Sequence, residues 1–170
     1  MEENHKREKV REYAIEGFRN GLNCAESVFD SLQRSGMLEV SEGAIAMCVG
    51  FGGGIGLSGY TCGALSAAVM AVGAKHGRKD PWAVPAEERG PQIAQKYYRR
   101  YNRLVDDFRK IHGVPLCREI TSGMEWSSKE RRLKCMNLIG DTAVLAYDYL
   151  KIPQEEAFIL EYKDNMSGLK

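Results

Sequence analysis

The stretch "TCGALSAAVMAVGAKH", Thr61 to His76, decides the fold that we predict for this chain. It carries no charged side chain before Lys75, and it has the length of a helix that lies inside a protein. Thr61 is a residue type that favours the N-cap position, so we expect the helix to begin there. A helix that is apolar on every side needs other elements around it. We therefore place it at the centre of the fold.

Helical periodicity also marks most of the remaining chain. The predicted helices run from near Val10 to near Gly21, from Asn23 to Gly36, from Ser41 to about Val49, from Ile93 to Gly113, from the capping box Ser127–Glu130 to Pro153, and over "QEEAFILEY". Residues 77–92 predict a loop and residues 114–126 an irregular connection. The expected fold class is all-α: one domain over residues 1–170, a bundle of about five to seven helices with a Gly-rich loop before the central helix and a polar tail from about residue 163.

The composition argues against nucleic-acid and membrane partners. The net charge is +1 and charged residues make up 28% of the chain, so no strong field of either sign is expected. The opening "MEENHKREKVREY" lacks the apolar core of a signal peptide, and we expect a cytoplasmic protein. From Gly43 to Ala74 there is no Asp, Glu, Lys, Arg or His, but glycines divide this segment into pieces too short to span a bilayer. We interpret its lack of charge as burial and expect no membrane insertion.

The glycine-rich stretch "GFGGGIGLSGYTCGAL", Gly50 to Leu65, matches a phosphate-binding loop in its glycine spacing but not in its structural context. Gly54, Gly56 and Gly59 satisfy G-x-G-x-x-G, and Asp80 follows about 20 residues later. That motif needs a preceding strand in a βαβ unit, and the chain offers no strand. We expect no nucleotide. The glycines instead predict a tight turn with close approach to neighbouring helices, and the structural positions are Gly52, Gly53, Gly54, Gly56 and Gly63.

An aromatic and basic run, "KYYRRYNR" from Lys96 to Arg103, could suggest nucleic-acid binding. Tyr97 and Tyr101, however, share the apolar stripe of the helix over residues 93–113, which predicts that they face the core. The arginines of the run are then expected to form an ordinary solvated face. We therefore expect no nucleic-acid partner.

The five cysteines contain no C-x-x-C pair, so zinc-ribbon, thioredoxin and c-type haem signatures are absent. Spacing alone favours buried, inert thiols, but the local settings say more. Cys24 and Cys62 are expected in the first turns of helices, where the dipole and free N–H groups lower a thiol pKa. Cys117 is expected in an irregular loop and Cys135 on an amphipathic helix, so these four could converge inside a bundle. Cys48 lies in an apolar run, so we expect its side chain to pack in the core.

Four blocks of this chain resemble one protein family: "FRNGLNCAESVF", "GFGGGIGLSGYTCGALSAAVMAVGAKHG", "FRKIHGVPLCREI" and "RLKCMNLI". They are similar to the redox-active proteins named for a CGAxxG motif and four cysteines, the C_GCAxxG_C_C type, from about Phe18 to Tyr149. By that resemblance the family cysteines are Cys24, Cys62, Cys117 and Cys135. The last glycine of the motif is Ala67 here, and Cys48 is outside the pattern.

The resemblance implies a redox function carried by the four family cysteines. A similar cysteine domain accompanies an iron centre in the split-Soret cytochromes, although this chain lacks their C-x-x-C-H haem attachment. Four thiolates as ligands suit an iron–sulfur cluster, most simply 2Fe–2S, or a single metal ion. The redox partner is not indicated, and a homo-oligomer stays open.

Two alternatives keep the same helical fold. The four cysteines could work by thiol–disulfide exchange, with Cys62 as the attacking thiol and therefore the catalytic residue. The bundle could also bind a partner or small ligand without chemistry. A nucleophilic pair of Cys62 with His76 or His112 has no support in the sequence, because both histidines are expected near helix C-termini. The sequence leaves open whether the protein is an enzyme.

Overall fold

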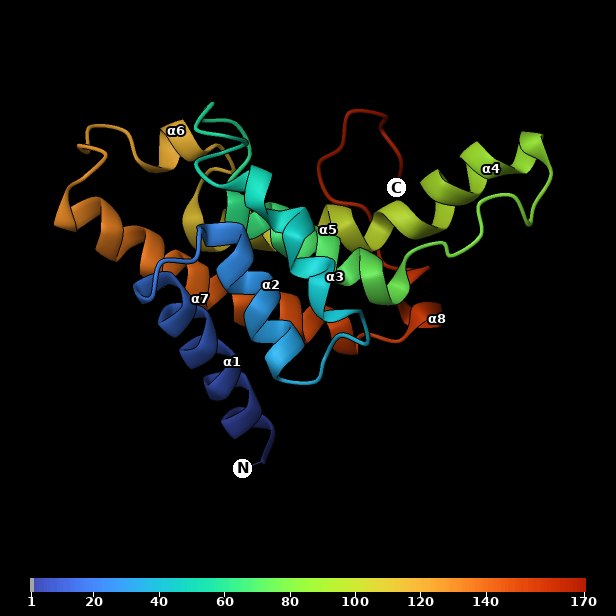
Figure 1. Cartoon of the computed structure of the whole chain (residues 1–170). Coiled ribbons are helices and arrows are strands. Elements are labelled where there is room, and N and C mark those ends of the chain that lie inside the picture. The colour runs from blue at the N-terminus through green and yellow to red at the C-terminus, as the bar shows by residue number, and fades with distance from the viewer. Residues whose placement is uncertain (1) are drawn as a thin grey trace.

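The computed structural model describes residues 2–170. Its regular structure is helical, so the all-α prediction is confirmed (Figure 1). The elements are α1 (Glu2–Arg19), α2 (Cys24–Arg34), the 3₁₀-helix η1 (Glu42–Phe51), α3 (Gly63–His76), α4 (Ala86–Gln92), the π-helical turn η2 (Ile93–Tyr97), α5 (Tyr98–His112), α6 (Cys117–Ile120), α7 (Lys129–Lys151) and α8 (Gln154–Ala157). The described residues thus contain eight α-helices rather than the predicted five to seven, because α4 lies in the predicted loop and the four-residue α6, too short to show a hydrophobic period, lies in the predicted irregular connection.

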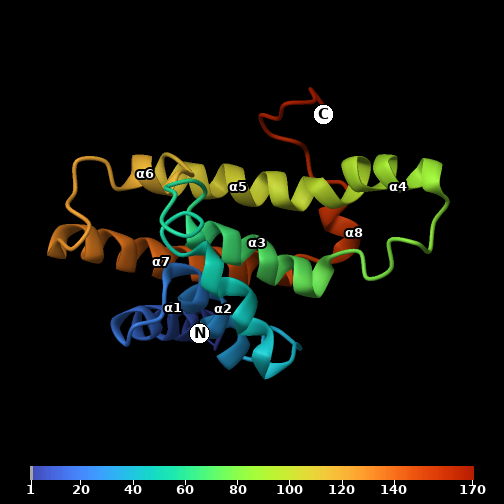
Figure 2. The ribbon, with the colours of Figure 1, turned by 45° about the horizontal axis from the view of Figure 1, so that its top comes forward.

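The helix at the centre of the fold is α3, as predicted. It packs against α2, α7, η1 and α5, and Figure 2 shows it between α5 and α2. Most of its buried positions are small: Gly63, Ala64, Leu65, Ala67, Ala68, Ala71 and Val72. Small side chains let neighbouring helices approach closely, so α3 can be surrounded without leaving voids.

The longest helix, α7, supplies the other half of the core. It contacts α1, α2, α3 and α5. All of its buried residues lie from Leu138 onward, whereas residues 129–137 are exposed or half-buried. The first turns of α7 therefore extend past the core (Figures 1 and 2). Cys135 lies three residues before Leu138, the first buried residue of the helix.

One arginine of the "KYYRRYNR" run is buried, so the prediction of a uniformly solvated basic face is wrong. Arg100 is only 2% exposed. Its guanidinium donates to the carbonyls of Tyr149 at 2.7 Å and Ile152 at 2.9 Å, and also to Pro153 and Gln154. Tyr149 and Ile152 lie at the C-terminus of α7, where carbonyls lack helical partners, whereas Pro153 and the Gln154 side chain belong to the start of α8. Arg100 thus ties α5 to the end of α7.

Several predicted boundaries shift. Residues 77–92 are not all loop, because α4 begins at Ala86, and Figure 1 shows α4 projecting from the bundle. The N-cap of α7 is Ser128 rather than Ser127, and its hydroxyl accepts from Arg131 N at 3.1 Å. The last helix ends at Ala157, and the following tail docks on α5 through Asn102, which accepts from Lys163 N. No helix within residues 2–170 is long and apolar enough to cross a bilayer.

The glycine-rich stretch is folded, but its tip is not buried as predicted. Residues 53–57 all have positive φ, from 55° to 69°, so the chain makes a left-handed turn. Three of the five are Gly53, Gly54 and Gly56, which adopt this conformation without a side-chain penalty. Ile55 and Leu57 are the exceptions, at a cost of roughly 1–2 kcal/mol per residue. Their side chains are 47% and 69% exposed, so the uncharged segment reaches the surface.

Candidate redox site

The four family cysteines lie on one cavity. It has a volume of about 190 Å³ and is lined by Phe18, Asn23, Cys24, Gly53, Cys62, Cys117, Ile120, Thr121, Trp126, Arg131, Cys135, Leu138 and Ile139. The convergence expected from the sequence is therefore present in the fold. Cys48 is fully buried elsewhere, which agrees with a packing role. All five cysteines are free thiols.

Backbone pairing brings Cys62 beside Cys117. Cys62 N donates to the Pro115 carbonyl at 2.8 Å, and Cys117 N donates to the Tyr60 carbonyl at 2.7 Å. Between these two bonds, Thr61 and Leu116 form an isolated antiparallel bridge. The end of the glycine loop is thus aligned with the segment that leads into α6, and Figures 1 and 2 both show α6 next to this loop. Cys117 begins α6 rather than lying in an irregular loop as predicted.

Cys24 is positioned by the predicted cap of α2. The side chain of Asn23 accepts from Ala25 N and Glu26 N, while Asn23 N donates to the Glu26 carboxylate, which completes a capping box. The Asn23 amide also donates to the Val49 carbonyl at 3.2 Å. One residue therefore sets the start of α2 and joins it to η1, immediately before the cavity cysteine.

Gly63, the first residue of α3, is a glycine because of what surrounds it. A Cβ atom there would lie 2.5 Å from the sulfur of Cys24 and 2.6 Å from the Phe51 carbonyl oxygen. Both distances are far inside van der Waals contact, so the cavity wall has no room for a methyl group. The glycine after Cys62 thus lets the start of α2 and the start of α3 meet.

The loop glycines act in the two ways expected for them. A Cβ on Gly54 would lie 2.7 Å from the Cys117 Cβ, and one on Gly52 would lie 3.2 Å from Asn23, so both positions need close approach. Gly53 lines the cavity, and its Cβ would collide with Leu57. Gly56 has open space around it and needs glycine only for its positive φ. The predicted structural glycines therefore support the cysteine cavity.

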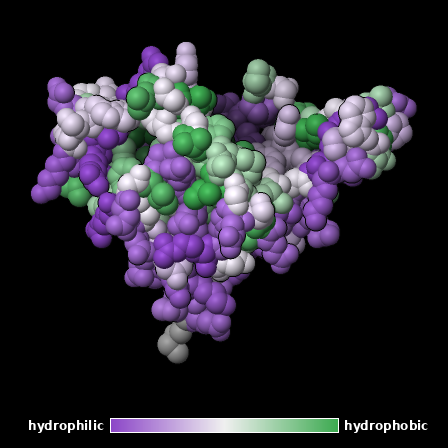
Figure 3. Space-filling view, in the orientation of Figure 1, coloured by the Kyte–Doolittle hydropathy of each residue, from purple (hydrophilic) through white to green (hydrophobic). Residues whose placement is uncertain are grey.

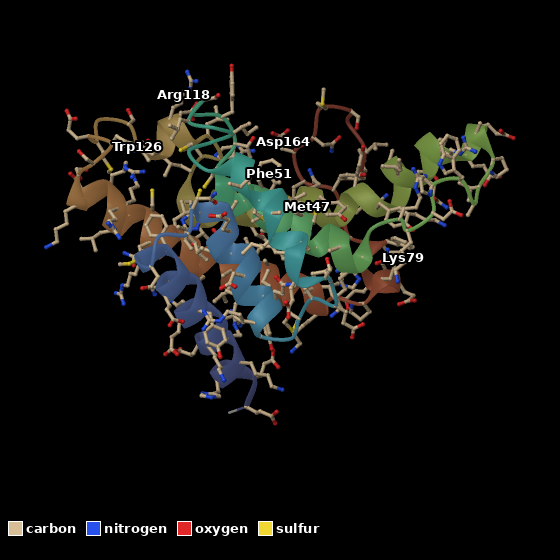
Figure 4. The ribbon with its side chains drawn as sticks, in the orientation of Figure 1. Met47, Phe51, Lys79, Arg118, Trp126 and Asp164 are labelled. Atoms are coloured by element: carbon tan, nitrogen blue, oxygen red, sulfur yellow. The ribbon has the colours of Figure 1, made fainter. Side chains whose placement is uncertain are left out.

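Sequence reasoning missed two residues of the site, Trp126 and Arg131. Arg131 is the only charged residue among those that line the cavity. Its Nε donates to the Trp126 carbonyl, and its guanidinium carbon lies 3.8 Å from the centre of the Trp126 ring. Figure 4 shows Trp126 on the segment before α7, at the same end of the molecule as Arg118. The spacing of four residues between Arg131 and Cys135 on one predicted helix was the available signal.

Burial raises the pKa of three cavity thiols. It raises the pKa of Cys62 to about 12, with the neighbouring Cys24 adding to the shift, while the N–H groups of Leu65 and Ala64 act in the opposite direction. Burial also raises the pKa of Cys117 and of Cys135, and the Arg131 charge offsets part of both shifts. The prediction that a helix start lowers the Cys62 pKa is therefore wrong. Cys62 is itself the N-cap of α3, and desolvation outweighs the helix terminus.

The donor set is chemically uniform. Four thiols line the cavity, and no His, Asp or Glu side chain lines it. His76 is bonded through Nε2 to the Leu150 carbonyl at 2.9 Å, and His112 ends α5, so both lie at helix C-termini as predicted and neither lines the cavity. Within residues 2–170, no three or more His, Cys, Asp or Glu side chains are arranged to hold a metal ion as they stand. The thiols share a cavity without forming a closed ligand set.

Comparison with known proteins assigns the family. A family model described as "Putative redox-active protein (C_GCAxxG_C_C)" matches residues 22–149. The chain belongs to this family. The pattern in its name is G-C-A-x-x-G rather than the C-G-A-x-x-G expected from the sequence, so this chain, aligned at the cysteine, differs from it at Thr61, Gly63 and Ser66. An "Uncharacterized protein" of Archaeoglobus fulgidus is 29% identical over 148 residues, which cover 85% of this chain and 95% of that protein. No solved structure matches.

Proposed function

We propose that Cys24, Cys62, Cys117 and Cys135 together hold an iron–sulfur cluster, most simply 2Fe–2S, in a protein that transfers single electrons. The observation that carries the proposal is that all four family cysteines line one cavity. Such a cluster would supply reversible one-electron oxidation and reduction. The domain that carries it spans residues 1–170.

The chemistry of the cavity supports thiolate ligation. Sulfur donors with no competing imidazole or carboxylate favour iron–sulfur clusters and soft metals. Burial raises the pKa of Cys62, Cys117 and Cys135 and so favours their protonated forms, and binding has to release these protons, as for any thiolate site. Arg131 places one positive charge beside the negative charge that the ligands then acquire.

The remaining lining is suited to excluding water. Four of the lining side chains are apolar: Phe18, Ile120, Leu138 and Ile139. Trp126 also lines the cavity, and its carbonyl accepts from Arg131. An apolar shell lowers the local dielectric constant and slows access of oxygen and water to ligated sulfur. Four ligands from α2, the start of α3, α6 and α7 must approach one another for ligation, because they form no closed set in the free chain.

Anaerobic purification tests the proposal. We expect iron and sulfide in the protein, a visible charge-transfer spectrum, and an electron paramagnetic resonance signal on one-electron reduction. Each of the four single Cys→Ser variants should lose the cluster, while Cys48→Ser should retain it because Cys48 is buried outside the cavity. Colourless, metal-free protein with four alkylatable cavity thiols, after anaerobic reconstitution as well, would overturn the proposal.

Thiol–disulfide exchange is the second candidate, favoured by the backbone pairing that sets Cys62 beside Cys117. In that reaction two thiols form one disulfide and release two protons and two electrons to an external disulfide, which becomes two thiols. Mass spectrometry after mild oxidation should then find a reversible Cys62–Cys117 bond. Absence of any reversible disulfide among the four cysteines would contradict it.

A further inference from the structure

The surface beside the cysteine cavity is apolar and uncharged. Five large side chains form it, which we call the apolar patch: Met47 and Val49 on η1, and Ile55, Leu57 and Tyr60 on the glycine loop. Each is between 47% and 69% exposed. Figure 3 shows apolar atoms gathered over η1 and the glycine loop, and Figure 4 shows Met47 on η1. Isolated exposed apolar residues are ordinary, whereas a gathered set indicates an interaction surface.

The two parts of the patch are held together by the backbone. Gly56 N donates to the Gly50 carbonyl at 2.9 Å, and Leu57 N donates to the Gly52 carbonyl at 3.2 Å. The tip of the loop is thereby fastened against the end of η1. The patch is a folded surface, so a partner would meet it without first ordering a segment.

Backbone strain gives a second and independent indication. Ile55 and Leu57 adopt φ values of 66° and 67°, which are unfavourable for bulky side chains and most of all for β-branched isoleucine. Within the monomer these side chains gain little burial in return, because they stay 47% and 69% exposed. Strained backbone positions cluster at functional sites, and a contact that buries these two side chains would compensate for the strain.

The apolar patch contains no charged residue, which favours an uncharged partner surface. No residue from Gly43 to Ala74 is charged. The nearby Arg118 donates its guanidinium to the Ser58 and Gly59 carbonyls and lies over the Tyr60 ring, so it is held at the edge of the loop. Partners that bind briefly are usually steered by complementary charge, which this patch does not offer. Two uncharged patches, in contrast, can meet across a two-fold axis without like-charge repulsion.

We infer that the apolar patch binds the same patch of a second copy of this chain, forming a two-fold dimer. This goes beyond the proposed function. The loop that makes the contact carries Gly53 and Cys62 of the cavity at its two ends, so each copy would hold its own cysteine cavity next to the shared interface.

The test compares the full-length chain with the double variant Ile55→Asn, Leu57→Asn. Asparagine tolerates positive φ, so this change removes apolar surface while it relieves strain. Sedimentation velocity between about 1 and 100 μM should show a concentration-dependent wild-type dimer, and the variant should weaken dimerisation at least about tenfold. The variant's thermal unfolding, extrapolated to low protein concentration, should be no lower than that of the wild type. Ile159→Asn, at a 79% exposed residue outside the patch, is the matched control and should dimerise as wild type.

Two results would overturn the inference: a wild-type monomer over the whole concentration range, or a double variant that dimerises as tightly as wild type. If the wild-type monomer also co-sediments with phosphatidylcholine vesicles, the patch is a lipid-binding surface instead. Iron content measured on the same samples keeps this outcome separate from the proposed function, because Ile55 and Leu57 do not line the cavity.

Discussion

The α-carbon of Gly63 faces the sulfur of Cys24 so closely that a Cβ atom would lie 2.5 Å from it. The glycine that follows one cavity cysteine thus leaves the space for another, which comes from a different helix. This contact links the local sequence around Cys62 to the geometry of the whole cavity.

Gly63→Ala is therefore expected to disturb both packing and ligation. The methyl group has to displace the Cys24 sulfur or the Phe51 carbonyl, and overpacking of this kind costs about 1–3 kcal/mol. Chemical denaturation should show this loss, and the iron content should fall together with it. Gly43→Ala is the matched control, since nothing lies within 4 Å of its Cβ position. Equal stability and iron content in the two variants would contradict the steric explanation.

Removing the positive charge from the cavity should weaken metal binding. Arg131→Gln leaves the charge of four thiolates without a cation among the lining residues, and we expect the Co²⁺ affinity of the reduced, metal-free protein to fall about tenfold. Arg131→Lys should restore part of it. Arg132→Gln, one residue along α7 and exposed, should bind Co²⁺ as wild type does. An unchanged affinity in Arg131→Gln would show that the charge has no role in ligation.

Arg100 should be one of the least replaceable side chains of the fold. Arg100→Ala leaves the carbonyls of Tyr149 and Ile152 without their donor at the end of α7, which should cost about 1–3 kcal/mol for each unpaired carbonyl, and Arg100→Lys somewhat less. Urea denaturation measures the difference. The exposed Arg109 on the same helix is the control, and Arg109→Ala should stay within about 0.5 kcal/mol of wild type.

Stability should fall in mild acid because of two histidines. Burial lowers the pKa of His76 and of His112 in the folded protein. The unfolded chain therefore takes up protons first, from about pH 6.5, and the stability present above that pH is lost as pH falls through the folded values. The double variant His76→Gln, His112→Gln should show a flatter dependence of unfolding free energy between about pH 7 and 5. His5→Gln, at an exposed site, should keep the wild-type slope.

Several elements of the fold were predictable because their signals are local. The apolar run after Thr61 predicted the central helix, and Asn23 caps α2 as expected. The four-residue α6 was not predictable, since one turn of helix shows no period, whereas α8 lies at the start of the last helix that was predicted and is shorter than expected. Ser127 and Ser128 are adjacent serines, so sequence could not choose between them as the N-cap.

The site was predicted in part. The four cysteines came from their flanking residues and family resemblance, and the fold places them on one cavity. The raised pKa of Cys62 was missed because a helix start acts over one turn, whereas desolvation depends on every neighbour. Trp126 was missed because it forms no motif and only tertiary packing brings it to the cysteines, whereas Arg131 could have been found from its four-residue spacing to Cys135 on one helix.

The sequence by itself determined the all-α class, the central position of α3 and the family of the chain, because hydrophobic period and local motifs carry that information. Tertiary structure alone decided which side chains of those patterns lose contact with water. It buried Arg100 among carbonyls of α7, and it left Ile55 and Leu57 exposed on a strained loop. Burial is a sum over contacts from distant parts of the chain, so no local pattern specifies it.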